Sequence, residues 1–168
     1  ILYFINNVSD AELLPRFRRR LMVEAVCFVV FFVPFVIYVL LKDGFAVAAA
    51  SGSIVMESYK YFHNLMAMPW VLGLFLLGVV AVLFGLGRSI LCATYNKGIW
   101  FAGVGTVLAV LALLLTVGYN NTAYYPSAAD LQSSLTLSNS CSSLFTLKTM
   151  AYVSVFVPFV LAYIIYAW

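Results

Sequence analysis

The sequence predicts an all-α integral membrane protein whose chain crosses the bilayer about four times. Of its 168 residues, 65% are hydrophobic and only 9% are charged, whereas a soluble domain has about 25% charged residues. The apolar residues form continuous runs of about 20, the length that a helix needs to cross a hydrocarbon core. Membrane-spanning β-strands would instead alternate apolar and polar residues. Because lipid cannot pair backbone N–H and C=O groups, these runs must be helices.

Four spans are expected within a single transmembrane domain over residues 1–168, at residues 21–41, 69–90, 99–119 and 148–168. Residues 1–8 are interpreted as the end of an upstream span, so we expect a fragment of a larger polytopic subunit. Pro15 is expected to break the helix that follows the first polar residues. Pro34 and Pro158, inside the first and fourth spans, predict kinks.

Two longer loops, residues 43–67 and 120–147, are expected on the non-cytoplasmic side. The first should contain a short interfacial helix or an ordered loop, with its tyrosines at headgroup depth. The remaining loops are basic, and the positive-inside rule therefore assigns them and the C-terminus to the cytoplasm. Contact with lipid headgroups is compatible with this role, and no nucleic-acid partner is expected. The basic residues concerned are Arg16, Arg18, Arg19, Arg20, Arg88 and Lys97.

Small residues recur four positions apart in the second and third spans. Ala81 and Gly85 form one such pair, and Gly105 and Ala109 form another. This spacing permits close approach of two helices in a membrane. A charged substitution at Gly105 is therefore expected to impair helix packing.

Glu24 is the only acidic residue inside a span, and an intramembrane carboxylate is a candidate proton relay or ion ligand. We favour a simpler interpretation, in which Glu24 pairs with Arg20 one turn earlier. His63, the only histidine, is expected to be a hydrogen-bonded loop residue and not a haem or metal ligand. Asp43 before Gly44 is interpreted as a helix stop.

The sulfur-containing residues also suggest no site. The five methionines are interpreted as packing or lipid-facing residues, although each could serve as an axial haem ligand. The cysteines form no Cys-x-x-Cys pair and should be free thiols. We therefore predict no catalytic, cofactor-binding or metal-binding residue in this chain. The methionines are Met22, Met56, Met66, Met68 and Met150, and the cysteines are Cys27, Cys92 and Cys141.

The order of polar residues along the chain resembles the C-terminal half of subunit II of the bacterial cytochrome bd ubiquinol oxidases. The stretch from Gly118 to Tyr163 is the most specific part, because hydropathy alone cannot generate polar matches at fixed offsets. Asn120-Asn121 departs from a Phe-Pro pair that is common in the family, and Cys141 replaces an alanine. The matching residues are Asp43-Gly44-Phe45, residues 62–64, Pro69-Trp70, Gly118-Tyr119, Tyr125-Pro126-Ser127, residues 134–137, Ser142-Ser143, Thr146-Leu147, Met150, Val157-Pro158, Leu161 and Tyr163.

The resemblance implies a complex of the bacterial cytoplasmic (inner) membrane that oxidises a quinol and reduces oxygen to water. In this family haems b and d and the quinol-oxidising loop belong to subunit I, so this chain would be a non-haem structural partner without catalytic residues. The lipid bilayer, and a structurally bound quinone or lipid, are further partners to consider. The alternatives are a membrane anchor or assembly factor, or a fragment of a secondary transporter or channel. Transporters place broken helices and charged residues at mid-membrane. In this sequence Glu24 is the only acidic residue that falls within a predicted span and could have such a role.

Overall fold

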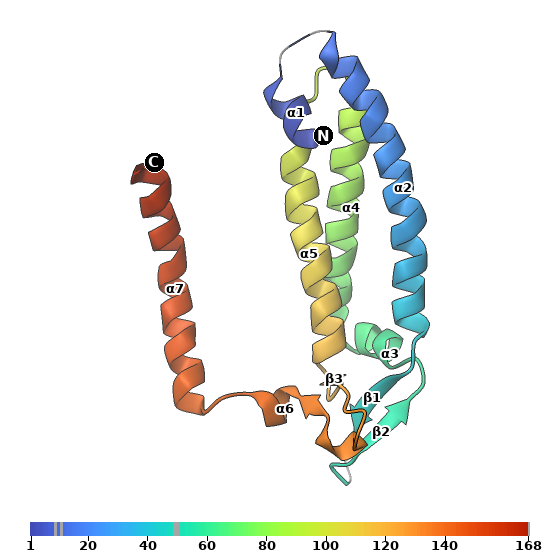
Figure 1. The fold of residues 1–168 in the computed structure, drawn as a ribbon, viewed down its shortest axis with the longest axis vertical. Helices are drawn as coiled ribbons and strands as arrows, with labels where there is room; N and C mark the ends of the chain where they lie inside the picture. Colours follow the sequence, from blue (N-terminus) through green and yellow to red (C-terminus); the bar gives the residue numbers. More distant parts are fainter. Residues whose placement is uncertain (9, 11, 49–50, 168) are drawn as a thin grey trace.

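Three long helices pack side by side, and a fourth stands apart from them (Figure 1). The computed structural model describes residues 1–8, 10, 12–48 and 51–167. The packed helices are α2 (Leu13–Leu41), α4 (Pro69–Leu91) and α5 (Gly98–Gly118), and the separate helix is α7 (Leu144–Ala167). All four are long and apolar enough to cross a membrane. The predicted all-α membrane fold is confirmed, but only three of the four helices form the bundle.

Helix α2 begins eight residues before the predicted start of the first span. The prediction that Pro15 breaks the helix was wrong, because Pro15 is the third residue of α2. The first N–H groups of a helix have no intrahelical acceptor, so a proline in the first turn removes no helical hydrogen bond. Helix α4 begins at Pro69 for the same reason.

A short helix, α1 (Leu2–Asn7), packs against α2 and α5 at one end of the bundle. Its Ile5 side chain is buried. The rings of Phe4 and Phe17 stack with their centroids 5.4 Å apart, which joins α1 to the first turns of α2. This end therefore has a small apolar contact of its own.

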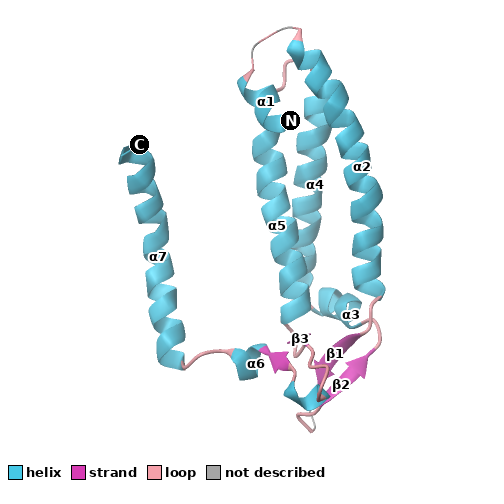
Figure 2. Ribbon diagram, viewed as in Figure 1, coloured by secondary structure: helices cyan, strands magenta, loops and turns pink. Residues whose placement is uncertain are grey.

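The opposite end has a layer of strands and short helices, as Figure 2 shows. The first long loop folds into a hairpin of β1 (Gly44–Val47) and β2 (Ile54–Glu57), followed by α3 (Lys60–Ala67). The expected short helix is present, whereas the hairpin was not predicted. Gly44 lies opposite Glu57 in the antiparallel register. Two four-residue strands are too short to give a clear alternating pattern in the sequence.

The second long loop lies against this hairpin. It contains an antiparallel pair, β3 (Ala123–Tyr125) and β4 (Leu135–Thr136), with η1 (Leu131–Ser133) between them and α6 (Leu137–Ser140) after them. The side chain of Gln132 donates to the carbonyl oxygen of Ile54 over 3.1 Å and accepts from its N–H over 2.8 Å. Gln132 thus imitates a β-strand partner and joins the two loops.

The closest helix contact in the bundle is between α4 and α5. A Cβ atom on Gly105 would lie 2.6 Å from the carbonyl oxygen of Gly78 and 2.9 Å from the Cβ atom of Ala81. A Cβ atom on Gly85 would lie 2.7 Å from the carbonyl oxygen of Gly98. The close packing expected from the small-residue spacing is confirmed. The buried residues of α5 are small and repeat every three or four positions: Gly98, Ala102, Gly105, Ala109, Ala112 and Thr116.

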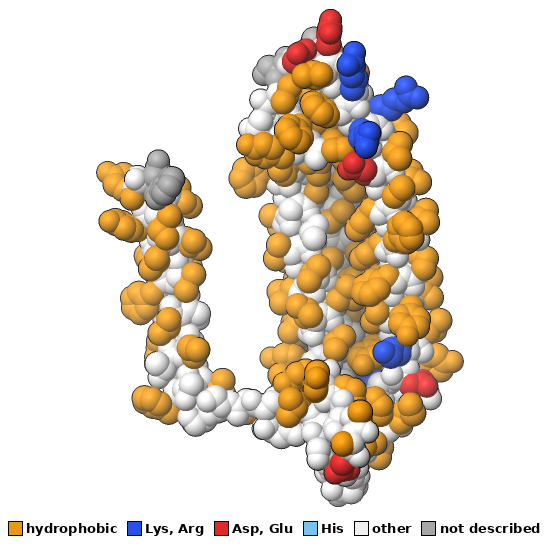
Figure 3. Space-filling model, in the orientation of Figure 1, with side chains coloured by type: hydrophobic (Ala, Val, Ile, Leu, Met, Phe, Trp, Pro, Cys, Tyr) orange, Lys and Arg blue, Asp and Glu red, His pale blue; other side chains and the backbone are white. Residues whose placement is uncertain are grey.

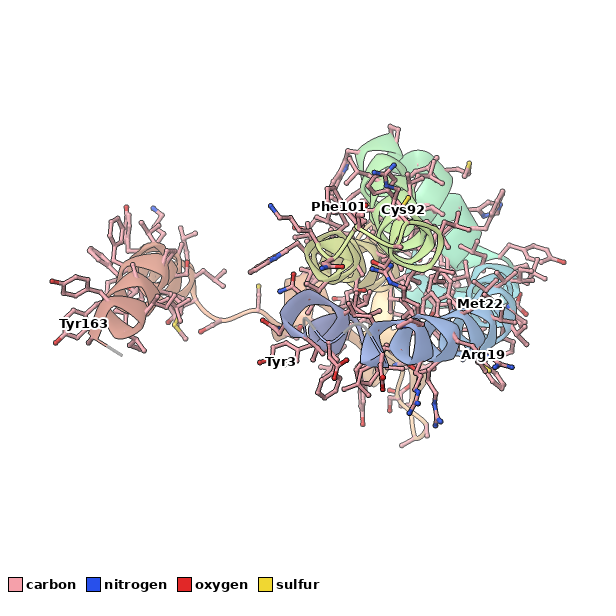
Figure 4. All side chains as sticks on the ribbon, turned by 90° about the horizontal axis from the view of Figure 1, so that it is seen from above. Tyr3, Arg19, Met22, Cys92, Phe101 and Tyr163 are labelled. Carbon is pink, nitrogen blue, oxygen red and sulfur yellow. The ribbon has the colours of Figure 1, made fainter. Side chains whose placement is uncertain are left out.

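No described residue of α7 is buried. Figure 3 shows hydrophobic side chains on the visible face of this helix, as on the bundle. Seen from above, α7 lies well separated from the other helices, and Tyr163 points away from them (Figure 4). The surface of α7 is therefore available to lipid or to other membrane helices.

Candidate functional site

The described part of the chain has no group of three His, Cys, Asp or Glu residues that could hold a metal ion. Cys27, Cys92 and Cys141 are free thiols. Met68 is buried in an apolar cluster with Leu65, whereas the other four methionines are at least about half exposed. The residues that sequence reasoning considered for ligation are thus scattered over the molecule.

Glu24 is exposed on α2, and its expected partner does not bind it. The ion pairs among the described residues all involve Glu57, so the predicted pair between Glu24 and Arg20 is not formed. An exposed i,i+4 pair gains only about 0.3–0.5 kcal/mol, which barely offsets the entropy of ordering two long side chains. Glu24 is the twelfth residue of α2 and lies one turn after Arg20, the last arginine of the basic cluster.

An apolar cavity of about 340 Å³ lies between α2, α4 and α5 at the middle of the bundle. Phe28 and Phe32 line it from α2, Val82 from α4 and Ala109 from α5. Its single hydroxyl, that of Thr106, already donates to the carbonyl oxygen of Ala102 over 2.7 Å. The lining therefore has no free donor for a polar ligand.

Arg18 joins α2 to the turn between α4 and α5 at one end of the bundle. The arginine cluster was predicted to lie in a loop, but it lies in the first turns of α2, which extend the helix beyond the apolar span. Its guanidinium donates to the carbonyl oxygens of Cys92 and Ala93, at 2.6 and 2.7 Å, and also to that of Ser89. A further bond of 3.0 Å reaches Oδ1 of Asn96. The last carbonyls of a helix lack intrahelical donors and carry partial negative charge. Arg18 thus caps α4 and holds the turn into α5.

A second polar group lies at the opposite end, where β2 leads into α3. The Glu57 carboxylate contacts Nζ of Lys60 at 3.0 Å and Nδ1 of His63 at 3.1 Å. The hydrogen bond from Lys60 lowers the pKa of Glu57 below its ordinary value of 4.5; desolvation opposes this shift and the His63 bond supports it. The carboxylate is therefore ionised at neutral pH. His63 is hydrogen-bonded as predicted, but it lies in a helix and not in a loop.

Asn64 forms the most buried polar network of the structure. Its Nδ2 donates to the carbonyl oxygen of Thr116 at 2.9 Å and to Oγ1 of Thr122 at 2.7 Å. Its Oδ1 accepts from Nδ2 of Asn120 at 3.0 Å. Asn64 and Thr122 are almost fully inaccessible. The side chain thus joins α3 to the C-terminal end of α5 and to the second long loop.

The turn after α5 needs two residues in the left-handed conformation. Asn120 and Asn121 have φ angles of 58° and 53°. Asparagine is among the few non-glycine residues that tolerate this region, whereas the ring of proline holds φ near −65°. The asparagine pair therefore suits the turn that presents Asn120 to Asn64.

Comparison with known protein families shows to which family the chain belongs. A family model described as cytochrome bd terminal oxidase subunit II matches residues 1–168. The chain belongs to the cytochrome bd terminal oxidase subunit II family. Neither a curated protein nor a solved structure matches it. As a member of the cytochrome bd subunit II family, the chain belongs to the structural subunit of a haem-containing quinol oxidase complex, and the transporter alternative is not favoured.

Membership in the subunit II family agrees with the multi-pass membrane structure and implies a partner subunit. Among the described residues, Arg18, Asn64 and Gln132 hold helices and loops together, and none of them lines the apolar cavity. Sequence reasoning missed Arg18 and Asn64 as organising residues. Arg18 is one of four arginines within five positions, and Asn64 stands in a mixed segment. Neither position carries a local signal that would distinguish it.

Proposed function

We propose that this chain is the non-haem subunit of its oxidase and that haems b and d and the quinol-oxidising site belong to subunit I. The observation that supports this most directly is the position of the only histidine. His63 lies outside the four long helices and contacts Glu57. Haem b needs axial side-chain ligands such as histidine inside the membrane. The role of this chain is then to stabilise the partner and the packing of the assembly.

We also propose in which membrane the chain lies and which end of the bundle faces the cytoplasm. The Arg18 contacts bring the basic first turns of α2 and the turn between α4 and α5 to one end of the bundle, and we assign this end to the cytoplasm of a bacterial inner membrane. Helix α7 then runs inward, and the C-terminus is cytoplasmic.

Thiol labelling tests this orientation. A membrane-impermeant maleimide added to intact cells should label Cys141, which is exposed at the hairpin end, but not Cys92, at the Arg18 end. Labelling of both thiols after permeabilisation would be the control. Labelling of Cys92 and not Cys141 in intact cells would reverse the orientation.

Purification tests the assignment of the haems. The full-length subunit, tagged and extracted in mild detergent, should carry with it a second large polypeptide, haem absorbance and quinol oxidase activity. When the two polypeptides are separated under mild denaturation, the haem should remain with the partner or be released. Haem retained by this polypeptide alone would contradict the proposal, as would solute transport by the purified chain in liposomes.

A further inference from the structure

Two polar side chains of helix α3 point into the structure and two large apolar side chains point outward, while Leu65 packs inward in the apolar cluster. Lys60 and Asn64 are only 6% and 0% exposed, whereas Phe62 and Met66 are 44% and 49% exposed. At 100° per residue these two pairs lie on opposite faces of the helix. A helix at the surface of a water-soluble protein has the reverse arrangement. The outward face of α3 is therefore suited to an apolar surrounding.

The inward polar groups have their partners within the protein. Lys60 is bound to Glu57, and Asn64 is bound to Thr116, Thr122 and Asn120. Their burial therefore leaves no unpaired charge or amide on this side. The inward positions of Lys60 and Asn64 are therefore compatible with the packing of α3, and Phe62 and Met66 are left on its outward face.

The outward face of α3 leads directly into the exposed surface of α4, a membrane-length helix. Only Met68 separates α3 from α4, and Trp70 in the first turn of α4 is 57% exposed. The Trp70 ring lies 6.5 Å from that of Tyr119 in an edge-to-face arrangement. Exposed Trp and Tyr at helix ends typically lie at the headgroup level of a bilayer. Figure 1 shows α3 near the ends of α4 and α5, at this level.

We propose that the outward face of α3 lies in the membrane, with Phe62 and Met66 among the upper acyl-chain carbons of the leaflet at the hairpin end. The occupant of this face is lipid, because the apolar face adjoins the span without interruption. His63 and Glu57, at the edge of the face, remain among the headgroups. Helix α3 is thus an interfacial helix that seats the extramembrane layer on the bilayer.

Depth-dependent quenching tests the proposal in the assembled oxidase. Single variants Phe62→Cys and Met66→Cys, each in a background with Cys27, Cys92 and Cys141 replaced by serine, are labelled with an environment-sensitive fluorophore. The complexes are reconstituted into phosphatidylcholine–phosphatidylglycerol vesicles. Either variant alone suffices if the other fails to assemble. Ser51→Cys, in the exposed hairpin turn, is the aqueous control, and Leu77→Cys, exposed in mid-α4, is the deep control.

Labels at positions 62 and 66 should emit at shorter wavelength than the label at position 51. They should lose most of their emission to lipids carrying a nitroxide high on the acyl chain, and little to aqueous iodide. The label at position 77 should respond most to a nitroxide near the chain end. Strong iodide quenching at positions 62 and 66 would show that water covers this face. Protection from both quenchers would show that a protein partner covers it, and either result would overturn the proposal.

Discussion

Replacing Gly105 with leucine will separate α4 from α5 and prevent normal assembly of the subunit. The nearest atoms to a new Cβ are the backbone oxygen of Gly78 and the backbone nitrogen of Val82, at 2.6 and 2.8 Å. Backbone atoms of a helix cannot move aside as a side chain can, so the two helices must shift apart. Overpacking commonly costs 1–3 kcal/mol, and we expect about 3 kcal/mol or more here.

Gly103 provides the matched control for this substitution. It lies two residues earlier in α5, and a Cβ atom there would meet nothing within 4 Å. Gly103→Leu should therefore assemble normally, and it should be slightly stabilised because glycine is the poorer helix former by up to about 1 kcal/mol. The measurements are the haem absorbance per unit of membrane protein and the thermal midpoint of the detergent-extracted complex. Equal assembly of the two leucine variants would show that this face of α5 is not closely packed.

Replacing Asn64 with aspartate will destabilise the junction of α3, α5 and the second long loop, although the two side chains have the same shape. Aspartate loses the Nδ2 donors to Thr116 and Thr122 and places a negative charge beside the carbonyl oxygen of Thr116. An uncompensated buried charge costs about 3–5 kcal/mol. Because burial favours the neutral acid, the loss should be smaller at acidic pH than at neutral pH.

Asn139→Asp is the corresponding control. Asn139 is exposed in the first turn of α6. Aspartate retains the bond that Oδ1 accepts from the N–H of Thr136, and it loses only the 2.9 Å bond from Nδ2 to the carbonyl oxygen of Ser134, at a position open to water. Its expected effect is about 1 kcal/mol, the net contribution of one hydrogen bond, without a buried charge. Thermal unfolding of the purified complex at neutral and acidic pH gives the comparison. A loss at Asn64 that does not exceed the loss at Asn139, or that grows on acidification, would contradict the proposed network.

The sequence predicted the helices well because lipid imposes a minimum apolar length on every span. Helices α4 and α5 begin and end within one residue of the predicted spans 69–90 and 99–119. The larger error is in the start of α2. Pro15 was expected to break a helix, but it lies in the first turn of α2, where a proline breaks no helical hydrogen bond. An apolar run shows where the membrane span begins, but not where the helix begins, because polar and basic residues can continue a helix beyond the membrane.

The sequence also predicted which residues allow close approach, but not how polar side chains are used. The spacing of Gly105 and Ala109 indicated a tight contact, and the structure identifies α4 as the partner. Arg18 caps α4, while Arg19 beside it is exposed. Their side chains are identical, so only the rotation of α2 about its axis distinguishes them. The outward apolar face of α3 likewise depends on which side of the helix meets the bundle.

By itself, the sequence determined that this protein spans a bilayer as helices. In lipid, the backbone N–H and C=O groups of four long apolar runs can be paired only within helices. Tertiary structure decided which helices touch and which side chains join them. Apolar length places a helix in lipid but does not select its neighbour, since lipid tails are as apolar as leucine. That is why α7 satisfies the same rule as α4 and α5 and yet lies apart from them.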